Sequence, residues 1–506
     1  FVLSKKIMKK MNLLVMSLVS AAALSFTSCS SNDDLDDNKA GQEKVDGYYM
    51  TLTVQSPNAS GTRTSVVDPT ENATAGEAAI TNGTLYLVDD QNNIAFHEDL
   101  SGLDWSGDVK DDASKKKDGT KTFEIKVPQV EAGQTYRVYF LAGSHKPAGG
   151  MDFAATSNNF FTAATNSFAS PFANANDFAM FNQNDAQVNG NGYSVTFIKA
   201  NNNKQNPAKV TYTSADGNNT QKDAAIKVER VVARIDAPVN KSTKVLASYP
   251  ENASEALKVA IDDAKDKVAK IELVDYAVAN LANQSYVMQT WSENQLSLPA
   301  NTEYTQKADD FGTKYLYEDK KFFNNNTVNY VFENNSSKNP TTMYFEYKVT
   351  LKDKEMTNAD FNAEDANKGT FYRYNNVIYT SFAQIFEDYK DVTNLFGEGK
   401  TAATMKEELS NAINDEAKLA KFREDYKIEV FKGGKTYYKQ VIKDNHIGYA
   451  NAIQRNSIYR LTVNNIFNVG AQVPNGEPTE ENKFYYINVT VTVNPWVLNN
   501  QDVDLQ

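Results

Sequence analysis

Residue types that catalytic and metal sites use most are scarce in this sequence. The 506 residues include one cysteine and three histidines, so no intrachain disulfide can form. His97, His145 and His446 are far apart in polar surroundings, where a chance solvated histidine explains each better than a shared site. There is no HExxH, GxSxG, phosphate-loop or paired-cysteine motif. We therefore expect no enzymatic activity, no cofactor and no metal.

Acidic residues are plentiful but form no recognisable site. The run Asp33–Asp37 lacks the glycine and the terminal glutamate of a calcium loop, and nothing isolates a carboxylate pair for glycosidase chemistry. The formal net charge of −12 would repel a phosphate backbone. We therefore expect no nucleic-acid partner.

Tryptophan is also scarce, with 3 residues, whereas tyrosine and phenylalanine number 27 each. Aromatic and β-branched residues favour pleated strands over helices. A hydrophobic content of 41% and a charged content of 23% are typical of a globular protein with a real core. At roughly 100–200 residues per domain, the length predicts two or three domains.

The first 29 residues have the layout of an export signal. A basic segment precedes the apolar stretch Leu13–Phe26, which is too short to span a bilayer comfortably. Thr27 and Ser28 then precede Cys29, as in a lipobox, with Phe26 where leucine is more usual. This pattern predicts lipid attachment, including a palmitate-type acyl chain, at Cys29. The alternative is a buried core cysteine after an uncleaved anchor. Met8 and Met11 are the candidate start residues.

The polar run Ser30–Asp37 that follows has two compatible interpretations. Its composition alone predicts a solvated tether. It also resembles the acidic export tag that directs lipoproteins of Bacteroidales-type bacteria to the outer face of the outer membrane.

The first half of the chain alternates between apolar and polar residues, as strands do. In Tyr48–Gln55, the residues Met50, Leu52 and Val54 alternate with threonines. A long polar stretch, Ser56–Asn82, follows and contains Arg63; its length indicates a linker or a functional segment. Further strands are expected at Thr84–Val88, Thr122–Val127, Tyr136–Leu141, Tyr193–Ile198 and Lys209–Thr213. These patterns predict an antiparallel sandwich of two sheets.

The second half combines strands with two helices. Ile226–Ile235 predicts a strand, and we place a domain boundary at about residue 230. Ala253–Val268 and Ala402–Phe422 carry apolar residues at spacings of three and four, which predicts surface helices packed on a sheet. Further strands are expected at Lys270–Val278, Thr342–Leu351, Tyr426–Phe431, Lys435–Ile442, Ser457–Val463 and Tyr486–Val493. The fold class is therefore mainly β: two β-sandwich domains in tandem, with a few surface helices in the second.

Three short segments carry a family resemblance. They are Val228–Arg234 (VERVVAR), Arg455–Leu461 (RNSIYRL) and Val489–Trp496 (VTVTVNPW). In their order and positions they resemble the major fimbrial subunit (fimbrilin) family of Bacteroidales, in particular the short-fimbria subunits of type V pili. The resemblance covers essentially the whole chain, although residues 240–440 match only in general character. It implies transthyretin-like sandwich domains.

The resemblance also implies an assembly mechanism. In this family an exported lipoprotein holds its first strand in a groove of the N-terminal sandwich, and a trypsin-like protease cleaves after an arginine in the following loop. A C-terminal strand from another subunit then replaces that first strand, which is β-augmentation with an internal placeholder. Here Tyr48, Met50, Leu52 and Val54 would form the placeholder strand. Cleavage would fall between Arg63 and Thr64; the alternative is an incidental solvated arginine.

The donor strand would come from the tail after the break expected at Pro495. The candidate donor residues are Trp496, Leu498, Val503 and Leu505. Val503 and Leu505 alternate with aspartates and would share one face of a strand, whereas Trp496 and Leu498 have the opposite parity. The alternative is an ordinary final strand packed on its own domain, a role that Tyr486–Val493 fills better.

Taken with the export signal, the resemblance predicts a structural subunit of a surface fimbria, or pilus, that supports adhesion, biofilm formation and virulence. The predicted divisions are a signal peptide (1–29), a propeptide (30–63), and two sandwiches (64–230 and 231–506). Expected partners are copies of itself, anchor and tip subunits, the maturation protease and, through lipid before cleavage, the cell outer membrane. The alternative function is a surface glycan-binding lipoprotein that uses aromatic platforms such as Trp105 and Trp291.

Overall fold

In the computed structural model the chain consists of two units, Phe1–Val45 and Asp46–Gln506. The residues that it describes all lie in the second unit: 47–56, 71–105, 120–128, 130–155, 159–163, 169–184, 190–245, 249, 253–293, 295–317, 323, 328–352, 369–444, 452–476 and 487–497. Six of the predicted site residues lie outside these ranges, and their roles stay predictions: Cys29, Arg63, Thr64, Leu498, Val503 and Leu505.

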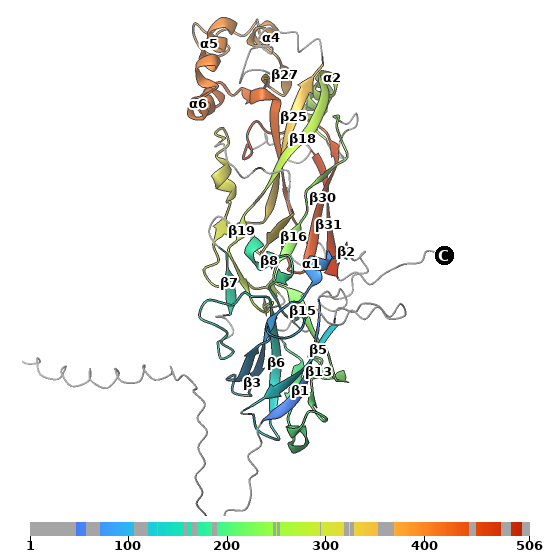
Figure 1. The fold of residues 1–506 in the computed structure, drawn as a ribbon. Coiled ribbons are helices and arrows are strands. Elements are labelled where there is room, and N and C mark those ends of the chain that lie inside the picture. The colour runs from blue at the N-terminus through green and yellow to red at the C-terminus, as the bar shows by residue number, and fades with distance from the viewer. Residues whose placement is uncertain are drawn as a thin grey trace, which may run out of the picture. The chain divides into compact units, whose positions relative to one another are not determined.

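Strands of the first half form one hydrogen-bonded sheet of eleven strands (Figure 1). Its main path runs β12-β1-β15-β10-β6-β11-β13-β14, with β3, β4 and β5 attached beside it. The bounds are β1 (Tyr48–Gln55), β3 (Gly83–Val88), β4 (Ile94–Asp99), β5 (Thr120–Val127), β6 (Thr135–Ala142), β10 (Met180–Asn182), β11 (Tyr193–Thr196), β12 (Ala208–Lys209), β13 (Thr211–Thr213), β14 (Thr220–Lys222) and β15 (Ile226–Arg230). All the predicted segments of this half contain strands, although Lys209–Thr213 is divided between β12 and β13. The predicted antiparallel arrangement is wrong at β1, which pairs in parallel with β12 and β15.

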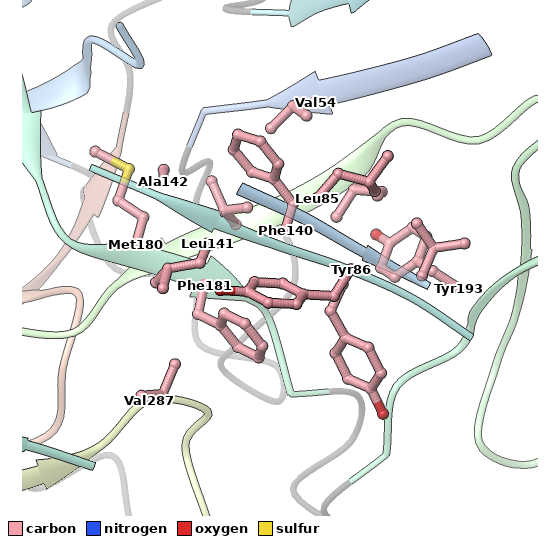
Figure 2. Packing of buried hydrophobic residues seen from close by; sticks show 14 of the residues in the cluster. Val54, Leu85, Tyr86, Phe140, Leu141, Ala142, Met180, Phe181, Tyr193 and Val287 are labelled. Carbon is pink, nitrogen blue, oxygen red and sulfur yellow. The ribbon is translucent and has the colours of Figure 1, made fainter. Parts of the chain in front are cut away.

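One large apolar core packs against this sheet. Figure 2 shows Val54 of β1 facing Leu85 of β3 and Phe140 of β6, all of them fully buried. Val287 from the second half of the chain joins the same core. The alternation in Tyr48–Gln55 therefore predicted which side chains of β1 are buried, whereas all six residues of β3 are buried.

Strands of the second half form a three-stranded sheet, β18-β25-β29, and most of another sheet on the path β2-β31-β30-β16-β24, with β17 beside β30. β2 is the one strand of that path that comes from the first half. Side chains from both sheets meet in a second apolar core, which includes Phe345, Tyr347 and Leu461. The bounds are β2 (Glu71–Asn72), β16 (Ala233–Ile235), β17 (Val239–Asn240), β18 (Val268–Ala279), β24 (Asn329–Val331), β25 (Thr342–Leu351), β29 (Lys435–Val441), β30 (Ser457–Ile466) and β31 (Ile487–Val497).

Short elements complete the described fold. The remaining strands are β7 (Phe160–Thr162), β8 (Ala173–Asn174), β9 (Asp177–Phe178), β19 (Leu281–Ala282), β20 (Gln284–Tyr286), β21 (Trp291–Ser292), β22 (Gln295–Leu296), β23 (Tyr304–Thr305), β26 (Phe371–Tyr374), β27 (Val377–Tyr379) and β28 (Glu429–Phe431). The 3-10 turns are η2 (Ser170–Phe172), η3 (Lys199–Asn202), η4 (Ala308–Phe311) and η6 (Lys432–Gly434). The described part of the protein is thus mainly β, as predicted, with several sheets and few helices. The two tandem transthyretin-like sandwich domains stay a prediction.

The strand predicted at Ile226–Ile235 is two strands. β15 pairs with β1 and β10 in the first sheet, whereas β16 pairs with β24 and β30 in the other. Val231 and Val232, which separate them, are both fully buried, so an unbroken apolar run concealed the change of sheet. The apolar cores also change near this point, although the first core includes four later residues: Ala282, Val287, Phe332 and Ile458. The domain boundary near residue 230 stays a prediction.

The helices match the prediction in part. α2 (Glu255–Lys267) forms as expected, with the hydroxyl of Ser254 accepting from the backbone N–H of Leu257. The single helix predicted at Ala402–Phe422 is instead α5 (Ala402–Ala412) and α6 (Glu416–Tyr426). The carboxylate of Asp415 accepts hydrogen bonds from the first turn of α6, and this N-cap starts a new helix.

α4 (Phe382–Asp388), α5 and α6 form a separate apolar cluster with the small sheet β27-β26-β28. Met405 and Leu409 of α5, together with Leu419 and Phe422 of α6, are buried in this cluster. These helices therefore pack on one another and on a short sheet of their own.

Candidate functional site

The predicted placeholder strand, β1, is an interior strand of the first sheet. It pairs antiparallel with β5 along its whole length, from Tyr48 opposite Val127 to Gln55 opposite Thr120. Its other edge pairs in parallel with β12 and, at Val54, with β15. Met50, Leu52 and Val54 are 0% exposed and Tyr48 is 7% exposed. The structure therefore brings all four predicted placeholder residues together in the first core.

The end of β1 is joined to the segment that follows the stretch 57–70. Ser56 is buried, and its hydroxyl donates a 2.8 Å hydrogen bond to the carbonyl of Ala78 in α1 (Ala75–Ala78). Loss of β1 would break this bond and the ladders to β5 and β15. It would also leave an apolar groove with unpaired backbone groups, which is a template for another strand.

Glu77 of α1 connects this segment to the second half of the chain. Its carboxylate accepts hydrogen bonds from Arg234 (3.1 Å), from the hydroxyl of Tyr330 (2.9 Å) and from the backbone N–H of Thr74 (2.7 Å). Burial alone would raise the pKa of Glu77, but these hydrogen bonds and the charge of Arg234 hold the pKa below its usual value. Glu77 is thus an ionised anchor for the residues after the predicted cleavage site.

The first two family motifs meet at this anchor. The Arg230 guanidinium is fully buried; its Nε donates to the carbonyl of Glu77 (2.9 Å), and its Nη1 donates to Oδ1 of Asn456 (2.8 Å). The backbone N–H of Asn456 in turn donates to the carbonyl of Val232 (2.9 Å). VERVVAR and RNSIYRL are therefore two sides of one polar junction.

Asp236 adds a second link between the same motifs. One carboxylate oxygen accepts from Nε of Arg234 at 2.6 Å, and the other accepts from Nε of Arg460 at 2.8 Å. The Asp236 side chain is 12% exposed. Both arginines thus bind one well-buried carboxylate.

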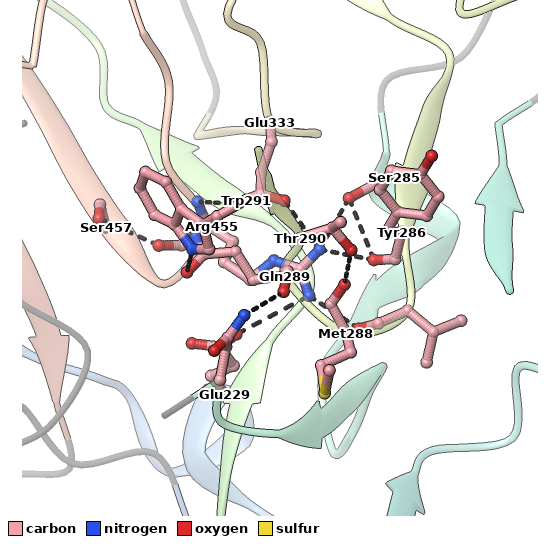
Figure 3. A network of polar contacts seen from close by, with 12 residues as sticks. Glu229, Ser285, Tyr286, Met288, Gln289, Thr290, Trp291, Glu333, Arg455 and Ser457 are labelled. Carbon is pink, nitrogen blue, oxygen red and sulfur yellow. Dashed lines mark hydrogen bonds and ion pairs between the residues drawn. The ribbon is translucent and has the colours of Figure 1, made fainter. Parts of the chain in front are cut away.

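Arg455 is the centre of a second buried network (Figure 3). Its side chain is 0% exposed and forms a 2.8 Å ion pair with Glu333. It also donates to the carbonyls of Val287 (2.8 Å) and Tyr286 (2.5 Å). Gln289 donates to the same Glu333 carboxylate at 2.7 Å. The guanidinium thereby fixes the strand-end segment 285–289 against the start of β30.

Glu229 is the second carboxyl group beside Arg455, and its interactions are weaker than those of Glu333. It is 1% exposed, its nearest oxygen lies 3.9 Å from Nη1 of Arg455, and neither oxygen has a hydrogen-bond partner among the described residues. Burial raises the pKa of Glu229 to about 8. Attraction to Arg455 lowers this pKa in part, and repulsion from Glu333 raises it further. At neutral pH this carboxyl is therefore mostly protonated.

Glu229→Gln should remove a pH dependence of stability. The pKa of Glu229 is about 8 in the folded chain against 4.5 for an ordinary glutamate, so the folded state binds the extra proton. Its contribution to stability is complete below about pH 4.5 and is lost as the pH rises to 8, by up to about 1.4 kcal/mol per pH unit. Chemical unfolding from pH 5 to 8 measures the free energy of unfolding of both proteins. The value for the variant should increase relative to that for the wild type as the pH rises. As a control, Glu272→Gln changes an exposed glutamate, and its free energy of unfolding should vary with pH as that of the wild type does. If Glu229→Gln also varied with pH as the wild type does, the assignment would be contradicted.

The last described strand, β31, closes the second half of the chain. It pairs antiparallel with β30, from Ile487 opposite Ile466 to Pro495 opposite Ser457. The expected break at Pro495 does not occur, because the strand continues to Val497; proline is tolerated where a ladder ends or has one neighbour. Trp496 lies opposite Glu71 of β2 and so pairs within its own chain.

The tryptophans proposed as glycan platforms are buried. Trp105 is 7% exposed and its Nε1 donates to the carbonyl of Leu100, while Trp291 is 5% exposed and donates to Gln289. Within the described ranges no group of three or more histidine, cysteine or acidic side chains is placed to hold a metal ion. No helix in the same ranges is long and apolar enough to cross a bilayer.

Sequence reasoning missed the acidic partners of the motif arginines. Glu77, Asp236 and Glu333 lie far from one another in sequence and in no shared pattern. Asp236, directly after a buried strand, was the most visible of them. Glu77 stands in a helix of four residues that no periodicity could reveal.

Residues 429–502 match the model of a protein family described as "Major fimbrial subunit protein type IV, Fimbrillin, C-terminal". In this C-terminal region the chain resembles the fimbrillin family. The match contains β28 to β31 and therefore the second and third motifs. Fimbrillins are structural proteins of cell-surface fimbriae that associate with other fimbrial subunits, and they are not enzymes.

Two of the solved structures that are similar to this chain come from fimbrial proteins. A fimbrilin from Porphyromonas gingivalis has 15% identity and a TM-score of 0.42 over 90% of this chain and 100% of that one. A fimbrial assembly protein from Parabacteroides distasonis has 10% identity and a TM-score of 0.26 over 61% of this chain and 82% of that one. No curated protein sequence matches this chain significantly.

Proposed function

We propose that this protein is a fimbrillin-type pilus subunit that is exported as a lipoprotein, cleaved after Arg63 and polymerised by strand exchange. Lipid on Cys29 would hold the precursor at the outer membrane until a trypsin-like protease cuts between Arg63 and Thr64. The position of β1 is the observation that supports this most. β1 is an interior strand with four buried apolar side chains, and the stretch that contains Arg63 is its covalent connection to all the residues that follow.

The contacts on either side of that stretch suit a selective release. β1 is held by strand ladders and apolar packing, which another strand can replace. The residues from Glu71 onward are held by different contacts: β2 pairs with β31, and Glu77 binds Arg234 and Tyr330. Cleavage would therefore free β1 while the new N-terminal segment stays anchored.

The donor in this proposal is the tail that follows β31. Because Trp496 pairs with β2 in its own chain, the donor begins at Leu498 and uses Val503 and Leu505 as further apolar contacts. The partners are copies of the same subunit, completed by anchor and tip subunits. Fibres built in this way would support adhesion and biofilm formation.

Arg63→Ala should leave an uncleaved precursor that is folded and does not enter fibres. The reason is that β1, still covalently attached, would keep the groove filled. Gel analysis of surface protein and electron microscopy of the cells measure processing and fibre formation. Thr70→Ala changes the same stretch but keeps the arginine, and should process normally. Abundant fibres from the Arg63→Ala variant would reject the cleavage assignment.

A further inference from the structure

A cavity of about 580 Å³ lies beside the helical cluster of the second half. Its lining comes from the β26–β27 turn, the end of α6, β28, and the segments around residues 314 and 472. Ligand sites for small molecules commonly fall between about 300 and 1,000 Å³. The cavity is far in sequence from β1 and from the motif arginines, and the proposed assembly makes no use of it.

The lining is cationic in an acidic protein. Lys314, Arg373, Arg423 and Lys427 contribute four positive charges, and Glu429 is the one acidic residue among the lining residues. The lining thus carries a net charge of +3, whereas the chain carries −12. A concave cationic surface concentrates anions by focusing the field.

The two arginines are held by the protein itself. Arg373 binds Glu429 through two hydrogen bonds and donates to the carbonyls of Val469 and Gly470. Arg423 is 2% exposed and donates to the carbonyls of Tyr315 and Val430. These fixed groups provide a background charge and leave no guanidinium fork free for a ligand.

Arg423 nevertheless retains an unused donor. Its Nε has no hydrogen-bond partner in the described part of the chain, although the atom is buried. Burial lowers the pKa of Arg423 to about 10, so the guanidinium stays charged at neutral pH. Its nearest carboxylate, that of Glu416, lies 4.0 Å from Nη1. A buried charge with a donor to spare is better satisfied by an acceptor that enters the cavity.

The lysines are the groups that a ligand can reach. Lys314 and Lys427 are exposed, and neither forms an ion pair with any residue that the structure describes. Their Nζ atoms lie 5.6 and 5.3 Å from the ring centroid of Tyr315, which holds both ammonium groups at the cavity. Lys427 has a left-handed backbone (φ 55°) directly after α6, which turns the chain at this point.

Amide side chains surround the charges. Asn375 and Asn376 form the tight β26–β27 turn, both with positive φ, and Gln472 lines the cavity beside β28. An amide both donates and accepts hydrogen bonds, which suits hydroxyl groups. Nδ2 of Asn375 already donates to the hydroxyl of Tyr389 (2.9 Å), and Oε1 of Gln472, which is 7% exposed, accepts from the backbone N–H of Val430 (2.8 Å). The lysines therefore provide point charges for one acid, and the remaining groups of these amides provide donors and acceptors for hydroxyls.

We propose that this cavity binds an acidic saccharide, with the sugar carboxylate at Lys314 and Lys427 and the hydroxyls at Asn375, Asn376 and Gln472. A sialic or uronic acid has this combination of one carboxylate and several hydroxyls. A free phosphate has the charge without the hydroxyls. The subunit would then carry a ligand site of its own, whether or not it enters fibres. The inference goes beyond the proposed assembly and does not depend on it.

Calorimetric titration of the full chain with 3′-sialyllactose and with trigalacturonic acid tests the proposal. At least one should bind, and at least tenfold more tightly than lactose, maltotriose, sodium acetate or inorganic phosphate at equal ionic strength. The double variant Lys314→Gln/Lys427→Gln should weaken that binding at least tenfold. Lys418→Gln/Lys421→Gln changes the same number of charges on α6 outside the lining and should bind as the wild type does.

Three outcomes would overturn the inference. The first is that neither acidic saccharide binds. The second is that phosphate binds as tightly as the saccharides, which would mean a simple anion site. The third is that both double variants lose affinity equally, which would mean a general charge effect. Circular dichroism and thermal unfolding of each variant establish that the fold is intact before the affinities are compared.

Discussion

Arg455→Met is expected to lower the free energy of unfolding by about 3–5 kcal/mol, because breaking a buried ion pair leaves a charge without its partner. The guanidinium is fully buried and binds Glu333 at 2.8 Å, while Glu229 lies 3.9 Å away. Its removal would leave the Glu333 carboxylate facing a second acidic group in the interior. It would also remove hydrogen bonds from the carbonyls of Val287 and Tyr286.

Two further variants distinguish the effect of breaking the buried network from the effect of removing any arginine side chain. Arg460→Met removes an arginine of the same motif that is 35% exposed, and should cost no more than about 1 kcal/mol. Arg455→Met/Glu333→Met removes both charges and should recover much of the loss. Denaturant unfolding of the three proteins measures the differences. If Arg455→Met costs no more than Arg460→Met, the buried network does not hold the junction.

A chain that begins at Thr64 and is kept from other subunits is expected to lose the first core. It would lack Tyr48, Met50, Leu52 and Val54, which are 0–7% exposed in the intact chain. Burying an apolar side chain of this size contributes about 1.5–3 kcal/mol, so four of them amount to roughly 6–12 kcal/mol as an upper estimate. Whole domains are stable by only about 5–15 kcal/mol.

The same chain should be rescued by the strand that it lacks. A synthetic peptide of residues 48–55 should raise its unfolding temperature and slow amide hydrogen exchange in β5 and β15. The same peptide with Leu52→Asp places a charge at a fully buried position and should not. A chain from Thr64 that is as stable as the intact protein, with or without peptide, would mean that β1 fills no essential groove.

Local patterns predicted most of the strands and the existence of the helices. Thr342–Leu351 forms a strand with the predicted ends, because its alternation is long and turn residues flank it. Tyr48–Gln55 likewise forms a strand with the predicted buried face. The α5–α6 break was missed because apolar spacing continues across it, although Asp415 before Glu416 is an N-cap signal.

Long-range partners could not be predicted in this way. Periodicity says which face of an element is buried, and it does not say which carboxylate meets which arginine. Arg230 reaches Asn456, and Arg455 reaches Glu333, across more than a hundred residues of sequence. β2 has only two residues, too few for any pattern, yet it pairs with the last described strand. The motifs marked the junction, and only the fold shows what they do there.

The mass and N-terminal sequence of subunits isolated from surface fibres test the central claim most directly. Strand exchange predicts subunits that begin at Thr64 and lack residues 48–55, with the C-terminal tail intact. Polymerised subunits that retain residues 48–55 would contradict it, because β1 would still occupy the groove that the neighbouring strand is meant to fill.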